Sequence, residues 1–327
     1  MPSGYLDFRQ LGQSVTSNND PVTVPPRMEI APRPFNATLS EAMNALARIW
    51  RPLLSTALLV FVPVGLFAVV VFRITGAADV MDLVMAGPQA LETLSDQALR
   101  ELLTPLLWAL GTTVIVQLVA AFFVYLVGHI LIAANLNGET MTAREARNEA
   151  LSRFGVSLGA GLLTVAAVLA LILSGFAVWL VPYALVGTPN ATSFVVATIL
   201  FFALVAPGVW VAVSLSMLTP VVALERRGVF GSMARSVSLV RGRWWPTLGY
   251  LLVVGLLGGV AIQLIQVVAF PLAAVAGTAG SSIVVAIVGI AGQGIIVAAV
   301  GAMYTLWYLD LRSRKERVLS EDLRPGS

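Results

Sequence analysis

The amino-acid sequence predicts an all-α integral membrane protein with six transmembrane helices. Hydrophobic residues make up 58% of the 327 positions and charged residues only 11%, whereas a soluble domain carries about 25% charged residues. The mean hydropathy is +0.88. Roughly 20 apolar residues cross the ~30 Å hydrocarbon core of a bilayer as a helix. Six stretches are long enough to do so: residues 53–72, 104–134, 156–186, 194–224, 246–270 and 283–309.

Two polar segments flank the six stretches. Residues 1–36 carry six prolines and too few apolar side chains to form a core, so we expect a disordered cytoplasmic tail there. Residues 37–312 form the predicted membrane domain, and residues 313–327 form a basic cytoplasmic tail. The chain has no cysteine, which excludes disulfides and thiol catalysis.

The placement of the basic residues predicts the orientation. All of the 20 lysines and arginines except Arg73 and Arg100 fall on one side of a six-span topology. Loops rich in lysine and arginine face the cytoplasm. The sequence therefore predicts a multi-pass protein of the cell membrane with both termini in the cytoplasm. Four tryptophans near the predicted inner boundary fit an aromatic belt: Trp50, Trp244, Trp245 and Trp307.

A short amphipathic segment precedes each odd-numbered span. Near residues 38–51, 142–154 and 230–244, apolar residues recur at helical spacing with charged residues opposite them. Capping-box motifs beginning at Thr38 and Thr142 would start the first two helices. Because such helices lie in the headgroup plane of a membrane, we predict three repeats of an interfacial amphipathic helix followed by a helical hairpin.

Proline and small residues predict details of helix shape and packing. Pro63 and Pro207 lie inside the first and fourth spans, where the missing N–H should kink each helix. Small residues at a spacing of four let helices approach closely. They occur at Gly155/Gly159, Gly255/Gly259 and Gly294/Ala298/Ala302.

Few strongly polar side chains lie at membrane depth. They include His129, the only histidine, and the glutamines Gln117, Gln263 and Gln266. An ionisable residue in hydrocarbon suggests a functional site because its burial is costly. A neutral imidazole or amide can equally form a hydrogen bond between helices. We favour hydrogen bonding, and a polar cavity lined by these residues stays the alternative.

The third amphipathic segment and the end of the last span contain the densest set of charges. Glu225 and Asp310 are expected at the cytoplasmic boundary beside four arginines: Arg235, Arg241, Arg243 and Arg312. One interpretation is a set of ion pairs that holds the helix ends together. The other is an arginine-rich cradle for anionic lipid headgroups, because guanidinium groups match phosphate.

The same region contains three motifs: Pro220-x-x-x-x-Glu225, Arg235-Ser-x-x-Leu-x-Arg241-Gly, and Tyr308-x-Asp310-x-Arg312-x-Arg314-x-Glu316. These motifs resemble those of the bacterial membrane-domain family named for glycerophosphoryl diester phosphodiesterases. The resemblance covers residues 36–325 and departs from the family at Arg317, where a glycine is more frequent. It implies a membrane module without the catalytic barrel of the fused enzymes, and therefore without their activity.

The sequence points to no catalytic chemistry. Paired catalytic carboxylates, a glycine-rich phosphate loop and a metal-ligand cluster are missing, so we expect no enzyme activity, cofactor or metal. We predict a non-enzymatic inner-membrane protein that interacts with lipids or acts as a scaffold for a membrane complex. The alternative is a transporter or permease subunit for a small or lipidic substrate, which needs a polar route at mid-membrane.

The charge distribution also predicts the partners. The basic residues lie in short clusters between apolar runs, which is typical of membrane anchoring and not of a nucleic-acid-binding face. We therefore expect membrane lipids with anionic headgroups as partners and no nucleic acid. A protein partner or a second copy of the chain stays open.

Overall fold

A computed structural model describes residues 35–77, 80, 96–186, 191–275 and 277–316. The predicted tail 1–36 lies outside them except for its last two residues, as does the predicted tail 313–327 beyond Glu316. The described residues are helical and contain no strand. Their helices are α1 (Phe35–Ile74), α4 (Asp96–Leu136), α5 (Ala143–Val186), α6 (Ala191–Ser214), α7 (Leu218–Glu225), α8 (Val229–Val240), α9 (Trp244–Val275) and α10 (Gly277–Ser313).

Six stretches of these helices are long and apolar enough to cross a membrane, which confirms the predicted six-span, all-α fold. Each overlaps one of the six predicted spans. They are Asn36–Ile74, Glu101–Leu136, Ala143–Leu180, Ala191–Glu225, Trp244–Ala269 and Val288–Ser313. The protein is therefore a multi-pass membrane protein.

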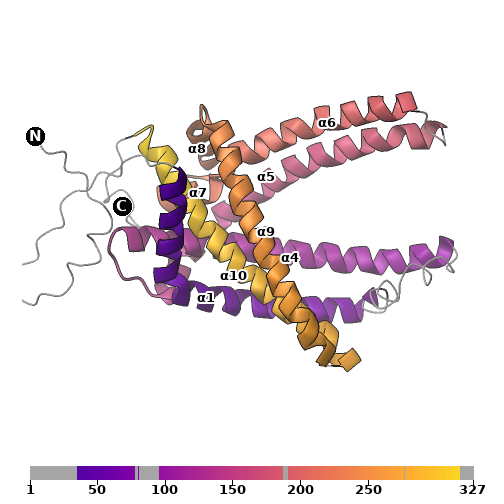
Figure 1. Ribbon diagram of the computed structural model, residues 1–327, viewed down its shortest axis with the longest axis horizontal. Helices are drawn as coiled ribbons and strands as arrows, with labels where there is room; N and C mark the ends of the chain where they lie inside the picture. The colour runs from indigo at the N-terminus through magenta and orange to yellow at the C-terminus, as the bar shows by residue number, and fades with distance from the viewer. Residues whose placement is uncertain (1–34, 78–79, 81–95, 187–190, 276, 317–327) are drawn as a thin grey trace, which may run out of the picture.

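The helices converge at one end of the bundle (Figure 1). Helix α10 packs against α1, α4 and α9, while α7 packs against α4 and α5. The hairpin of α5 and α6 diverges from α4 toward the opposite end (Figure 1). We call the convergent end the basic end. It contains the start of α1, the α4–α5 turn, the α7–α8 and α8–α9 turns, and the end of α10.

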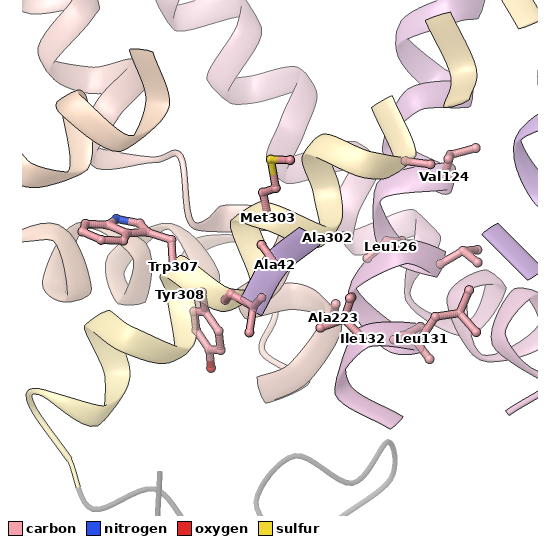
Figure 2. Close-up of a cluster of buried hydrophobic side chains, with 14 of the residues drawn as sticks. Ala42, Val124, Leu126, Leu131, Ile132, Ala223, Ala302, Met303, Trp307 and Tyr308 are labelled. Carbon is pink, nitrogen blue, oxygen red and sulfur yellow. The ribbon is translucent and has the colours of Figure 1, made fainter. Parts of the chain in front are cut away.

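The hydrophobic core lies toward the basic end. Figure 2 shows buried side chains from four helices meeting there, among them Ala42 of α1, Ile132 of α4, Ala223 of α7 and Tyr308 of α10. Along α6 and α9 most large apolar side chains are exposed instead. In a membrane such side chains face lipid tails, which are as apolar as leucine.

The predicted amphipathic segments have three different forms. Figure 1 shows α1 in two arms, and the N-terminal arm lies across the end of the bundle. Pro52 lies between the predicted segment and the span, and it lacks the N–H that continues a helix. The second segment continues into α5 without a break, and the third is the separate helix α8. The three-repeat plan therefore stays a prediction.

One predicted capping box is present and the other is wrong. Thr142 donates its backbone N–H and its hydroxyl to Glu145 Oε2, each at 2.8 Å, while the Glu145 N–H donates to the Thr142 hydroxyl at 3.3 Å. Helix α5 begins directly afterwards. Thr38, in contrast, lies inside α1, which already begins at Phe35. Since helix starts are set by the whole local backbone, a four-residue motif alone misplaces this one.

The fourth span is interrupted after α6. Helix α6 passes through Pro207, where the kink stays a prediction, and ends at Ser214. The break lies between α6 and α7. Pro220, in the first turn of α7, has no N–H to donate to Ser216, and its ring would clash with the Ser216 carbonyl in a continuous helix. The first turn of a helix tolerates proline because its N–H groups have no partner there.

The topology gives a first testable expectation. Reporter fusions after residues 140 and 230 should report the cytoplasm, and those after residues 188 and 278 the opposite side. Arg226 donates to Glu149 at 3.0 Å, which places the α4–α5 and α7–α8 turns at the same end. The fusions at 140 and 230 must therefore agree in either orientation, and opposite signals from them would contradict the six-span arrangement.

Candidate functional site

A buried carboxylate organises the basic end. Glu225 ends α7, and its side chain is only 7% exposed. Arg235 of α8 donates from Nε to both carboxylate oxygens at 2.9 Å, and Arg227 donates from Nε to Oε2 at 2.8 Å. The Tyr308 hydroxyl of α10 donates to Oε1 at 2.8 Å. Glu225 thus joins α7, α8 and α10 through charge-assisted hydrogen bonds, which are among the strongest in proteins.

The network extends along the end of α10. Arg312 Nη1 lies 3.4 Å from the Tyr308 hydroxyl, and Arg312 Nε lies 3.3 Å from Glu316 Oε2. Glu316 also pairs with Arg235. Burial lowers the pKa of Arg235, but the hydrogen bonds and negative charges of Glu225 and Glu316 outweigh it, so the pKa is raised. Arg235 therefore stays charged between two carboxylates.

The structure divides the predicted charge cluster into three parts. Glu225, Arg235 and Arg312 lie in one network, Asp310 pairs within its own helix, and Arg241 and Arg243 lie at the surface. Asp310 accepts from Arg314 of the same helix, at 2.7 Å from Nε and 3.1 Å from Nη2. A spacing of four places two residues on the same face of a helix. This local pair competes directly with more distant arginines.

Arg241 and Arg243 remain at the surface. Both side chains are exposed in the α8–α9 turn, and no carboxylate of the described residues pairs with either. Between them Gly242 has a φ of 86°, a conformation that glycine adopts without a Cβ clash. The turn therefore presents two guanidinium groups outward from the bundle.

Lys315 ties the end of the chain to the same turn. Its ammonium donates to the backbone carbonyls of Ser238 and Arg241, the latter at 2.9 Å. Carbonyls at a helix C-terminus have no partner within the helix, and lysine satisfies them. Burial and the positive charges of Arg235 and Arg241 lower the pKa of Lys315.

Helix α8 packs against the bundle through serines as well as apolar side chains. Its buried residues are Ser232, Ser236, Leu239 and Val240. Ser236 donates to the carbonyl of Ser214, near the end of α6, at 2.9 Å. Phe230 of the same helix is 78% exposed. Serines let two helices approach closely, and their hydroxyls donate hydrogen bonds to backbone carbonyls. A pattern of hydrophobic residues does not predict such contacts.

Trp307 is a core residue and not part of an aromatic belt. Its ring stacks on Tyr250 with centroids 4.6 Å apart, and its Nε1 donates to the Thr247 hydroxyl at 3.2 Å. The prediction for this tryptophan is therefore wrong, because α9 covers it. Trp50 and Trp245 are exposed as a belt requires.

His129 is fully buried between α4 and α10. Its Nδ1 lies 2.7 Å from the Thr305 hydroxyl, and that hydroxyl is 3.1 Å from the Gly301 carbonyl. Since the single hydroxyl proton can serve the carbonyl, Nδ1 then acts as the donor to Thr305. This is the interhelical hydrogen bond that the sequence analysis favours for a buried imidazole.

The glutamines do not gather around His129. Gln117 is half-buried on α4, and Gln263 is exposed on α9. Gln266 lies against Gly289 of α10, where a Cβ would meet its Nε2 at 3.3 Å. Three pockets among the described residues are lined by side chains other than His129 and these glutamines.

Sequence reasoning missed a second charged group at the basic end. Glu149 and Arg153 of α5 form an ion pair one helical turn apart, and Arg226 after α7 donates to the same carboxylate oxygen. The signal available in the sequence was the Glu149/Arg153 spacing of four. Nothing local could show that Arg226, which is 77 residues away from Glu149, completes the group.

A protein family of unknown function matches most of the chain. The sequence profile of a domain of unknown function, DUF7847, matches residues 35–311. The chain belongs to the DUF7847 family. No curated protein and no solved structure matches the chain. The match does not connect the chain with the phosphodiesterase-associated family, so that resemblance stays a prediction.

The DUF7847 region contains most of the site. It begins with α1 and includes Glu149, Glu225, Arg235 and Tyr308, and it ends one residue before Arg312. The contacts among α5, α7, α8 and the buried part of α10 therefore lie within the DUF7847 domain of this chain. Four residues that make further contacts lie after the end of this domain: Arg312, Arg314, Lys315 and Glu316.

Proposed function

We propose that this protein is a non-enzymatic, multi-pass protein of the cell membrane that binds anionic lipid headgroups on the cytoplasmic side. The binding surface is formed by exposed side chains of helix α8, of the turn that follows it and of the first residues of α9, which we call the α8–α9 surface. It consists of Phe230, Arg241, Arg243 and Trp245.

The observation that carries the proposal is the mixture of apolar rings and arginines on this surface. Phe230 is 78% exposed and Trp245 is 75% exposed, and the two exposed arginines lie between them in the sequence. At a membrane surface, aromatic rings enter the boundary between headgroups and acyl chains, and guanidinium groups reach the phosphates. The two aromatic rings gain nothing from exposure to water alone.

The electrostatic surroundings support the assignment. Lys315 lies beside the surface, and the positive charge of Arg241 contributes to its lowered pKa. Glu225 and Glu316 pair with Arg235 and Arg312, so no carboxylate in the described part of the chain neutralises the arginines of the α8–α9 surface. A cluster of basic residues at the cytoplasmic boundary attracts anionic lipid.

The test is a binding measurement on the full chain in nanodiscs that contain phosphatidylglycerol. Each near-surface arginine contributes about 1 kcal/mol of attraction, so Arg241→Gln together with Arg243→Gln should weaken lipid association about 30-fold. The number of bound anionic lipids can be counted by native mass spectrometry.

Arg73→Gln is the matched control, because Arg73 is an exposed arginine at the other end of α1. It removes one positive charge without touching the α8–α9 surface. The single variants Arg241→Gln and Arg243→Gln should each weaken association, whereas Arg73→Gln should not. Equal lipid retention by the wild type and the double variant would reject the proposal.

A further inference from the structure

The basic end also contains a pocket that is separate from the α8–α9 surface. Its volume is about 490 Å³, and it lies between α5, α7 and the turn that follows α7. One wall is charged and contains Glu149, Arg153, Arg226 and Arg227. The remaining lining residues are Ser152, Val156 and Val222.

Arg153 is the least exposed charged residue of the pocket. Its side chain is 7% exposed, and its Nη2 donates to Glu149. Its Nε and Nη1 have no hydrogen-bond partner in the described part of the chain. A guanidinium group carries five N–H donors and no acceptor. Burying such donors without acceptors is unfavourable, so Arg153, which lines the pocket, has two unsatisfied donors.

The pocket has an excess of positive charge. Three guanidinium groups line it, and Glu149 is its only carboxylate. The Oε1 atom of Glu149 accepts from both Arg153 and Arg226. Arg227 is held at one side by its Nε bond to Glu225. The side chains of Arg226 and Arg227 are each 49% exposed, so both can turn toward a ligand.

The backbone at Arg226 points to the same place. Arg226 follows α7 with φ of 50° and ψ of 35°, the left-handed conformation. It is the only residue other than glycine with positive φ in the described part of the chain. Glycine usually occupies this position after a helix because a Cβ makes the conformation unfavourable. In this unfavourable backbone conformation, the Arg226 side chain contacts Glu149 and lines the pocket.

We propose that this pocket binds a phosphate group. Three guanidinium groups around one site suit a tetrahedral anion with up to two negative charges, and arginine matches phosphate oxygens better than lysine does. The apolar side, formed by Val156 and Val222, accommodates the carbon part of a phosphorylated molecule. Two sources share this chemistry: the phosphomonoester headgroup of a membrane lipid and a free phosphate or soluble phosphate ester.

The experiment uses the full chain in detergent and two probes. Inorganic phosphate is titrated by isothermal calorimetry, and mixed micelles with phosphatidic acid are analysed by native mass spectrometry. Binding of phosphatidic acid alone assigns the pocket to a lipid headgroup. Binding of inorganic phosphate assigns it to a soluble phosphate. If the wild type binds neither probe, the proposal is wrong.

The variants test whether the pocket is the site. Arg226→Gln removes one charge-assisted hydrogen bond to the probe. It should therefore weaken binding of the probe about tenfold to a hundredfold. Arg226 is half-exposed, so this variant should fold even where Arg153→Gln does not. Arg73→Gln, at the opposite end, is the control for net charge. Unchanged affinity in Arg226→Gln would overturn the proposal.

Glu149→Gln provides a test of opposite sign. It removes the negative charge of the pocket and releases Arg153 and Arg226 from their shared acceptor, so phosphate should bind more tightly. A gain of affinity cannot result from misfolding, whereas weaker binding in this variant would count against the pocket. The Arg241 and Arg243 variants leave this pocket intact, so failure of one proposal is distinguishable from failure of the other.

Discussion

Replacing Arg235 with glutamine should destabilise the protein by about 3 kcal/mol, because removing one partner of a buried ion pair leaves the other charge poorly compensated. The Nε–H of Arg235 is shared by both oxygens of Glu225, and Arg235 also pairs with Glu316. Glu225 would keep only Arg227 and Tyr308 as partners in a site that water barely reaches. The measurement is the melting temperature of the purified full chain in detergent, or its midpoint of unfolding in a denaturant.

Arg241→Gln is the matched control, since it makes the same substitution one turn and a half further along the chain. Its side chain is exposed, so its melting temperature should stay close to that of the wild type. Glu225→Gln combined with Arg235→Gln should cost less than the two single variants together, because residues in one network are energetically coupled. A small and equal effect of Arg235→Gln and Arg241→Gln would show that Glu225 does not depend on Arg235.

The fold follows from features that are local in the sequence. Six apolar runs of sufficient length predict six helical spans, because the bilayer sets the length and the backbone must satisfy its own hydrogen bonds there. The capping box at Thr142 is also local, and the structure reproduces its reciprocal hydrogen bonds. Such features need no knowledge of which helices are neighbours.

The pairing of charges was only partly predictable. The sequence placed Glu225, Asp310 and several arginines at one boundary, but it could not choose the partners. Asp310 takes Arg314, four residues along its own helix, and Glu225 takes Arg235, ten residues away across a turn. The pocket lined by Arg153 and Arg226 depends on how α5 and α7 pack together. That contact arises from tertiary structure and leaves no pattern in either segment.

The small-residue motifs show the same division. The sequence predicts close helix approach at Gly255/Gly259 and at Gly294 alike. In the structure a Cβ on Gly255 or Gly259 meets nothing within 4 Å, whereas one on Gly294 would collide with Phe61. The motif indicates that a close approach between two helices is sterically allowed. Only the arrangement of α1, α9 and α10 decides where it occurs.

Replacing Gly294 with alanine should therefore destabilise the contact between α1 and α10. The new Cβ would lie 2.4 Å from Phe61 Cδ2, 2.6 Å from Cγ and 2.9 Å from Cβ. The last of these atoms is fixed to the backbone of α1, so rotation of the ring cannot relieve the clash. Overpacking of this kind costs about 1–3 kcal/mol, which a lowered melting temperature in detergent should reveal.

Gly259→Ala supplies the comparison, because it makes the same chemical change in α9 where a Cβ has open space. Alanine has a higher helix propensity than glycine by about 1 kcal/mol, so this variant should be neutral or more stable. Adding Phe61→Leu to Gly294→Ala should recover part of the loss, since it removes the ring that the new methyl group meets. Equal melting temperatures for Gly294→Ala and Gly259→Ala would mean that α10 does not pack on Phe61 at the distance described.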